Sequence, residues 1–429
     1  MKKTLIPHAC WAIAVLAAFG LGSKNGGPSA AATSDEAAAL GKSRLSSRSS
    51  DTGPDDLSSR RGDRAAAQRE SSALSRLFGQ IADGNLDSLL SQAFRDPNQI
   101  TRRLAFSKLL EAMTPENAGA MREQLVALGA EPDQWRDFHY AWGAIDGKAA
   151  FEHASNSPEA DLNDTMTGWA AANPAEALAM LDNLPEALKN QRDELTASVV
   201  GGLADNNRGL ATDLVLQLGR DGNAKASNLM DIVATQALRA DGPEAASRWS
   251  DSLPDGPLKS TAMGRIAESY ARKDPEGAAR WVQASAGESY AAKAVEQIGG
   301  RWAQSNPVAA VGWLESLPAG NGQTAGLRNA FGDWEDRDPV AAGEYLKAMP
   351  QSPQRDSSIS GFATGYAWQN PQVAVAWAQE ISDPALRESS LTWAGHVFYQ
   401  RDPAGATAWL ETSGLTAEAR QKVLQPMRR

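Results

Sequence analysis

The chain has 429 residues, 42% of them hydrophobic, and a formal net charge of −10 at pH 7. An acidic surface repels phosphate backbones, so this balance argues against a nucleic acid partner and favours a neutral or cationic one. The only cysteine is Cys10. If the segment that contains it is removed, disulfides, iron–sulfur centres and cysteine catalysis are excluded together.

The first segment has the layout of a secretory signal peptide. Lys2 and Lys3 precede an apolar stretch from about Cys10 to Leu21, and small residues come after it. This order predicts a signal peptide over residues 1–22 and an exported protein, periplasmic or secreted. The alternative is an uncleaved anchor, but the apolar stretch is shorter than the roughly 20 residues that a membrane-spanning helix needs. No later segment is apolar enough to span a bilayer, which predicts a protein peripheral to the envelope.

Residues 23–71 differ sharply in composition from the rest of the chain. They are rich in Ser, Gly, Ala, Arg and Asp and have almost no aromatic or β-branched side chains. Such a segment cannot bury enough apolar surface to offset the entropy lost on ordering, so we expect a disordered linker. From about Ser72 the pattern becomes helical, which predicts a repeat domain over residues 72–429 with capping helices at its ends.

A dipeptide that returns every 32 residues dominates the second half of the chain. The five copies are Asp274-Pro275, Asn306-Pro307, Asp338-Pro339, Asn370-Pro371 and Asp402-Pro403. A fixed period of this length predicts one small structural unit copied in tandem. Proline ends the preceding helix and fits the first turn of the next, and the Asp or Asn before it is a preferred N-cap.

Each unit is predicted to contain two amphipathic helices, helix A before the proline and helix B after it. With the proline as position 0, apolar residues fall at −12, −9, −8 and −5 and again at +3, +6, +7 and +10. In one unit these are Val295, Ile298, Gly299, Trp302, Ala310, Trp313, Leu314 and Leu317. Both sets have the spacing of a single helical face.

The same register extends back through the chain. Earlier units place position 0 at Pro115, Gly147, Pro174, Arg208 and Pro243, and position +3 is alanine in all ten units. A small residue retained there predicts that helix B approaches a neighbour closely, so a larger side chain should cost roughly 1 to 3 kcal/mol. A lone hairpin cannot bury its apolar faces. We therefore expect an all-α, right-handed α-α superhelix (a solenoid) of about ten two-helix repeats.

The unit resembles the tetratricopeptide and Sel1-type helical repeats in length, in its two-helix plan, and in the small residue before an aromatic on the second helix. It departs from the tetratricopeptide pattern by the Asp-Pro cap and by lacking the Trp-Leu-Gly-Tyr order on the first helix. It is also similar to uncharacterised exported bacterial repeat proteins that carry Trp, Asp-Pro, Ala and Trp-Leu in this order. The resemblance covers about residues 97–425 and implies an architecture but no activity.

Thirteen tryptophans raise the question of a carbohydrate-binding surface. Nine of them occupy positions −5 or +6 and are predicted to fill the core between helices. Trp368 and Trp393 stand at −3 and −10, where other units have polar residues such as Arg272 and Arg265. We expect both to face solvent on successive A helices, which makes them the candidate binding residues. The alternative is two isolated surface tryptophans.

No pattern in the sequence points to catalysis, a cofactor or a metal. The three histidines after the predicted signal, His139, His153 and His396, lack ligand spacing, and no nucleophile-elbow serine occurs. Glu268 precedes a serine, as the catalytic Glu of lytic transglycosylases does, but it lies inside an ordinary helix A and is expected to be a solvated carboxylate. Acidic pairs such as Glu335-Asp336 are likewise predicted to be solubilising surface.

The sequence therefore favours an exported, non-enzymatic scaffold that binds a protein or peptide partner across its repeats. The alternative, from another class, is a cell-envelope protein that binds carbohydrate or peptidoglycan through Trp368 and Trp393.

Overall fold

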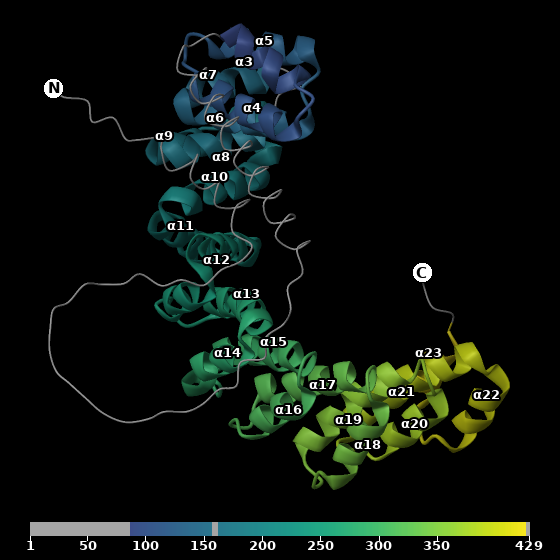
Figure 1. The fold of residues 1–429 in the computed structure, drawn as a ribbon. Coiled ribbons are helices and arrows are strands. Elements are labelled where there is room, and N and C mark those ends of the chain that lie inside the picture. Colours follow the sequence, from purple (N-terminus) through teal and green to yellow (C-terminus); the bar gives the residue numbers. More distant parts are fainter. Residues whose placement is uncertain (1–85, 157–161, 426–429) are drawn as a thin grey trace, which may run out of the picture. The chain divides into compact units, whose positions relative to one another are not determined.

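The computed structural model describes residues 86–156 and 162–425. The predicted signal peptide (1–22) and linker (23–71) lie outside these residues. All regular structure in the described part is helical, which confirms the all-α repeat fold (Figure 1). The chain divides into two compact units, and the boundary falls between Phe138 and His139.

The first unit begins with α3 (Leu86–Arg95), α4 (Gln99–Glu111) and α5 (Ala118–Leu128), and α6 (Pro132–Ile145) runs across the boundary. The predicted start of a helix B at Pro115 is wrong. The Asn117 side chain accepts a hydrogen bond from the Thr114 backbone N–H (2.8 Å) and closes a turn over residues 115–117. The helix therefore begins only at Ala118.

The second unit is a series of helical hairpins. Its A helices are α8 (Leu162–Ala172), α10 (Arg192–Asn206), α13 (Pro257–Lys273), α15 (Ala292–Ala303), α17 (Asn321–Glu335), α19 (Pro353–Tyr366), α21 (Pro384–Arg401) and the terminal α23 (Ala417–Leu424). Its B helices are α7 (Gly147–Asn156), α9 (Pro174–Asp182), α11 (Arg208–Arg220), α14 (Pro275–Val282), α16 (Pro307–Glu315), α18 (Pro339–Ala348), α20 (Pro371–Gln379) and α22 (Pro403–Thr412). In α12 (Ala226–Asp251) one hairpin's A and B helices are joined at Gly242, whose φ of 77° marks a kink.

The repeated Asp-Pro and Asn-Pro pairs are N-caps, as predicted. In all five, the Asp or Asn side chain accepts a hydrogen bond from the backbone N–H three residues later, at 2.8 to 3.2 Å. This bond satisfies one of the amide groups left without a partner at the start of helix B. Asn173 of an earlier repeat makes no such side-chain bond.

The alanine at position +3 is fully buried in every repeat, which confirms the predicted close approach. All ten alanines have 0% exposure: Ala118, Ala150, Ala177, Ala211, Ala246, Ala278, Ala310, Ala342, Ala374 and Ala406. Apolar residues of the A helices complete the core, among them Val295, Ile298, Ile359 and Phe362. The residues predicted from the helical period are thus the ones that the hairpins bury.

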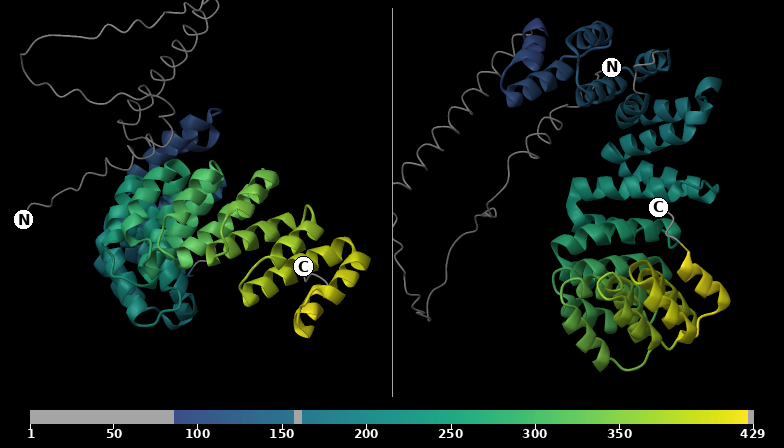
Figure 2. Two further views of the ribbon diagram at one scale, coloured as in Figure 1. Left: turned by 90° about the horizontal axis from the view of Figure 1, so that it is seen from below. Right: turned by 90° about the vertical axis from the view of Figure 1, so that its right-hand side faces the viewer.

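Hairpins pack against one another in chain order (Figure 2). Each A helix contacts the next one, from α8 through α10, α12, α13, α15, α17, α19 and α21 to α23. From α14 to α20, each B helix lies against both its own A helix and the following one. Successive A helices therefore form one continuous layer in this unit.

Side-chain hydrogen bonds that the sequence did not predict stabilise the ends of many B helices. At position −16, at or near the start of helix A, a long polar side chain donates to a carbonyl at or just after the end of the preceding helix B. The donors are Arg192, Lys259, Gln323, Arg355 and Arg387, at 2.7 to 3.1 Å. Carbonyls at a helix C-terminus carry partial negative charge and lack partners within the helix, so these bonds stabilise the joint.

Candidate functional site

The outward surface of the A helices is crossed by polar contacts between repeats. Arg265 of α13 binds Asp231 of α12 through two hydrogen bonds of 2.6 Å. Arg301 of α15 reaches Glu268 of α13 at 2.5 Å, and Gln304, directly after α15, donates to Asp333 of α17 at 3.2 Å. These bonds hold side chains of neighbouring repeats in fixed positions. We call this surface the A-helix face.

Trp368 and Trp393 interrupt this polar face, and the structure exposes both. Trp368 is 50% exposed and follows the end of α19, whereas Trp393 is 39% exposed and lies on α21. The Trp393 indole donates to the Thr364 carbonyl at 3.1 Å, one helical turn before Trp368. The predicted exposure is therefore confirmed, and their role in binding stays a prediction.

The two tryptophans share one edge of the structure without stacking on each other. No ring contact joins them among the aromatic pairs of residues 86–156 and 162–425. Arg401 lies on α21, the helix that carries Trp393, and donates hydrogen bonds to the backbone carbonyls of Trp368 and Gln369. The aromatic rings are thus presented on an ordered backbone, one on each of two neighbouring repeats.

One carboxyl group near these tryptophans was predicted to lie on the surface, and the structure buries it. Glu335, at the end of α17, is 0% exposed, so the prediction of a solubilising surface residue is wrong. Its position, −4, holds alanine in other repeats, such as Ala303 and Ala367, both fully buried. Position −4 faces the core, and the neighbouring Asp336, which is exposed, obscured this in the sequence.

Glu335 fits between the repeats because the residue that faces it in the next repeat is a glycine, which has no side chain. A Cβ atom on Gly365 would stand 1.9 Å from Glu335 Oε1, so no larger residue fits there without movement. Glu335 Oε1 has no hydrogen-bond partner in the described residues, and Oε2 accepts only a long bond of 3.4 Å from Gln369. Burial, with the nearby Asp336 charge, raises the pKa of Glu335 to about 8. The carboxyl is therefore protonated at neutral pH.

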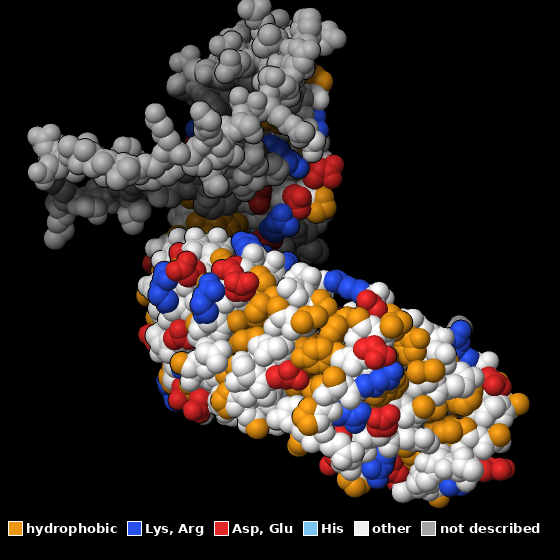
Figure 3. All heavy atoms as spheres, turned by 60° about the horizontal axis from the view of Figure 1, so that its bottom comes forward, with side chains coloured by type: hydrophobic (Ala, Val, Ile, Leu, Met, Phe, Trp, Pro, Cys, Tyr) orange, Lys and Arg blue, Asp and Glu red, His pale blue; other side chains and the backbone are white. Residues whose placement is uncertain are grey.

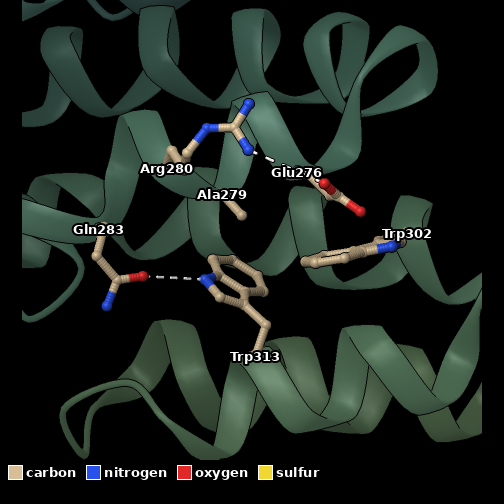
Figure 4. A pocket seen from close by; sticks show the side chains of 6 residues that line it. All are labelled: Glu276, Ala279, Arg280, Gln283, Trp302 and Trp313. Atoms are coloured by element: carbon tan, nitrogen blue, oxygen red, sulfur yellow. Dashed lines mark hydrogen bonds and ion pairs between the residues drawn. The ribbon is translucent and has the colours of Figure 1, made fainter. Parts of the chain in front are cut away.

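The B-helix side carries shallow grooves that the sequence did not predict. Figure 4 shows the groove between α14 and α16, with a volume of about 350 Å³. Its floor is formed by Trp302 and Trp313, whose ring centroids lie 6.0 Å apart. A second groove of about 510 Å³, one repeat earlier, contains Tyr270 and Trp281 with centroids 6.3 Å apart.

The grooves refine the prediction that tryptophans at −5 and +6 are core residues. Trp142, Trp169 and Trp334 are buried, at 3 to 5% exposure. The other six are only partly buried: Trp249, Trp281, Trp302, Trp313, Trp377 and Trp409. Where two such rings meet at the surface, they pack on the core and still offer an edge or face to a ligand. Hydrophobic side chains also reach the surface of this unit (Figure 3). Val308 on α16 is 56% exposed, and Val340 on α18 is 72% exposed.

The other residues considered for chemistry lie in ordinary structural settings. Glu268 is not a free surface carboxylate, because it pairs with Arg265, Arg272 and Arg301. His139 is buried and lies 3.4 Å from Thr165 Oγ1. In the described part of the chain, no three or more His, Cys, Asp or Glu side chains come close enough together to hold a metal ion.

No helix within residues 86–156 and 162–425 is both long and apolar enough to cross a membrane. Comparison with known proteins finds no matching family model, no similar curated protein and no similar solved structure. The candidate site therefore rests on the geometry of the chain alone. It consists of the A-helix face with Trp368 and Trp393, and of the two grooves on the B-helix side.

Proposed function

We propose that this chain is an exported, non-enzymatic scaffold that binds a protein or peptide partner on its A-helix face. The observation that carries the proposal is the exposure of Trp368 and Trp393 on two successive repeats, at positions that hold polar or small residues in the other Asp-Pro and Asn-Pro repeats. Tryptophan is among the residues most enriched at the energetic centre of protein interfaces, because it buries a large area at little entropic cost. Stacked repeats support an extended surface of this kind.

The same features support a place among tetratricopeptide- or Sel1-like repeats as part of this proposal. The unit length, the buried Ala at +3 and the aromatic at +6 agree with that architecture. Export is proposed from the composition of residues 1–22.

A pull-down from the envelope fraction of the native host tests the proposal. Trp368→Ala and Trp393→Ala, separately and together, should reduce the retained partner at least tenfold for the double variant. Val340→Ala is the matched control, because Val340 is even more exposed but lies on a B helix. Retention that survives the double variant, or falls equally with Val340→Ala, would place the partner elsewhere and contradict the proposal.

A second candidate function is the binding of cell-wall glycan by the same two tryptophans. Their exposed rings favour it, because an aromatic face stacks well on the C–H face of a sugar ring. Retention of the purified protein on sacculi, lost in the Trp368→Ala/Trp393→Ala double variant, would support this candidate. Absence of retention by the unchanged protein would exclude it.

A further inference from the structure

Two successive B-helix grooves are lined by the same positions of the repeat, one repeat apart. We propose that they are equivalent subsites for a neutral glycan that runs along the B helices, with one short stretch of sugar in each groove. The ligand class is that of the second candidate function, but the site is a different one. The inference does not depend on Trp368 or Trp393.

The first groove, between α14 and α16, combines an aromatic floor with a polar rim (Figure 4). Trp313 is held in place because its indole N–H donates to Gln283 Oε1 at 3.2 Å, and Trp302 lies tilted against it. Glu276 and Arg280 stand above the rings, 3.9 Å apart, and both are 72% exposed. The rim thus offers donors and acceptors to a ligand that lies on the rings.

The second groove repeats this arrangement one unit earlier. Trp281 donates to Asp251 at 3.0 Å and stacks with Tyr270. Glu244 and Arg248 form the rim pair, 3.2 Å apart. The matching residues of the two grooves lie at the same positions: glutamate at +1, arginine at +5, an acceptor at +8, and the aromatic pair from the following unit. Arg280 lines both grooves and connects them.

The chemistry of the rim favours a neutral polyhydroxyl ligand. In each groove, the glutamate at +1 and the arginine at +5 oppose each other's charge. The second groove also contains Asp251, Asp274 and Arg280, which leave an excess of one negative charge, so neither groove has the strong net charge that would select a highly charged ligand. A sugar ring has an apolar C–H face and a rim of hydroxyls that both donate and accept. An apolar floor with a few convergent polar groups is typical of small-molecule sites, and ligand pockets commonly enclose about 300 to 1,000 Å³.

Two equivalent grooves in succession favour a ligand that is built from repeating units. The two grooves follow each other along the repeats and share Arg280, so an extended ligand that leaves one groove can enter the other. The set does not continue into the next repeat, where Val308 and Gly312 replace the glutamate and the arginine. Two subsites, and not a full series, are therefore expected. A ligand long enough to reach both should bind more tightly than one that fills a single groove.

Isothermal titration of the purified chain with β-1,4-linked N-acetylglucosamine di-, tetra- and hexasaccharides tests the inference. We expect the tetrasaccharide to bind at least tenfold more tightly than the disaccharide. Arg280→Ala should weaken tetrasaccharide binding at least fivefold, because it alters both grooves. Glu276→Gln changes only the first groove and should weaken binding less. Both residues are highly exposed, so the fold should tolerate the changes.

Lys347→Ala is the matched control, since Lys347 is 62% exposed, pairs with Glu344 on α18 and lines neither groove. No binding of any oligosaccharide, or equal losses in Arg280→Ala and Lys347→Ala, would overturn the inference. Binding that Trp368→Ala/Trp393→Ala abolishes and Arg280→Ala leaves intact would also overturn it, while supporting the second candidate function. A Lys-rich peptide bound more tightly by Arg280→Ala than by the unchanged chain would assign the grooves to a cationic peptide instead.

Discussion

Two parts of the second unit join similar hairpins in different ways. Between α8 and α10 the contact is made by backbone, because a Cβ atom on Gly202 would stand 2.0 Å from the Thr167 carbonyl oxygen. Between α13 and α15 the contact is made by side chains, through Arg301 and Glu268. A backbone contact fixes the spacing of two helices but leaves little room for chemistry. Where side chains make the contact, the residues of the outward surface can vary. Both grooves lie in the part of the chain around α13 and α15.

The largest loss of stability expected from a substitution comes from filling the backbone contact. Gly202→Ala should lower the free energy of unfolding by about 3 kcal/mol, because the new methyl group overlaps a carbonyl that cannot move without its helix. Gly201→Ala in the same helix is the control, since nothing lies within 4 Å of its added Cβ. That change should stabilise by about 0.5 kcal/mol. Urea denaturation measures both, and equal effects would refute the close contact.

Removal of a position −16 donor should come next in size. Arg355 is 7% exposed, donates to the Leu346 carbonyl at 3.1 Å and pairs with Glu380 at 2.5 Å. Arg355→Met keeps most of the packing but leaves the carbonyl without its partner, which should cost about 2 kcal/mol. Amide exchange near the end of α18 should accelerate as well. Unchanged exchange there would show that this bond does not hold the joint.

Glu335 should make stability depend on pH in the direction opposite to that of a salt-bridged carboxylate. The carboxyl ionises near 4.5 in the unfolded chain but only at about 8 in the folded one. Between these values the folded state holds the extra proton, so the free energy of unfolding falls as pH rises, by at most about 1.4 kcal/mol per pH unit.

Glu335→Gln, which mimics the protonated form, should remove this slope, and its stability should match that of the unchanged chain near pH 4. Thermal denaturation between pH 4 and 9 measures the difference. A slope that is the same in both proteins would mean that Glu335 is ionised in the folded state.

The smallest effect is expected from a comparison of one repeat whose N-cap side chain makes its hydrogen bond with one repeat whose N-cap side chain does not. Asp338 accepts a bond of 2.9 Å from the Ala341 N–H, so Asp338→Ala should cost about 1 kcal/mol. Asn173 precedes the same kind of proline but makes no capping bond through its side chain. Asn173→Ala should therefore cost less than half as much in urea denaturation. Equal costs would show that the capping bond of Asp338 does not contribute to stability.

The sequence predicted the features that depend on local pattern. The helical period located the two helices of a unit, and the Asp-Pro cap and the Ala at +3 needed no information from distant residues. The helix start predicted at Pro115 is wrong because a hydrogen bond to the Asn117 side chain closes a turn there. The surface position predicted for Glu335 is wrong because its burial depends on Gly365, 30 positions away in the next repeat. The exposure of Trp368 and Trp393 was predictable because equivalent positions of the repeats could be compared.

The grooves were missed for a related reason. The aromatic residues at −5 and +6 were assigned to the core by period, and the period does not say how far a large ring extends to the surface. A signal was nevertheless present, since Glu at +1 and Arg at +5 recur in two consecutive units, as Glu244 with Arg248 and Glu276 with Arg280. Repetition of exposed residues, and not of buried ones, is the feature that points to a ligand.

The central claim is that the A-helix face takes the partner, and site-specific photo-crosslinking in the native host tests it most directly. A photoreactive phenylalanine would replace Arg272, which lies on α13 and is 64% exposed, or Lys347 on α18, which is 62% exposed. The account predicts a defined protein adduct from position 272 and none from position 347. The same adduct from both positions, or an adduct from position 347 alone, would contradict it.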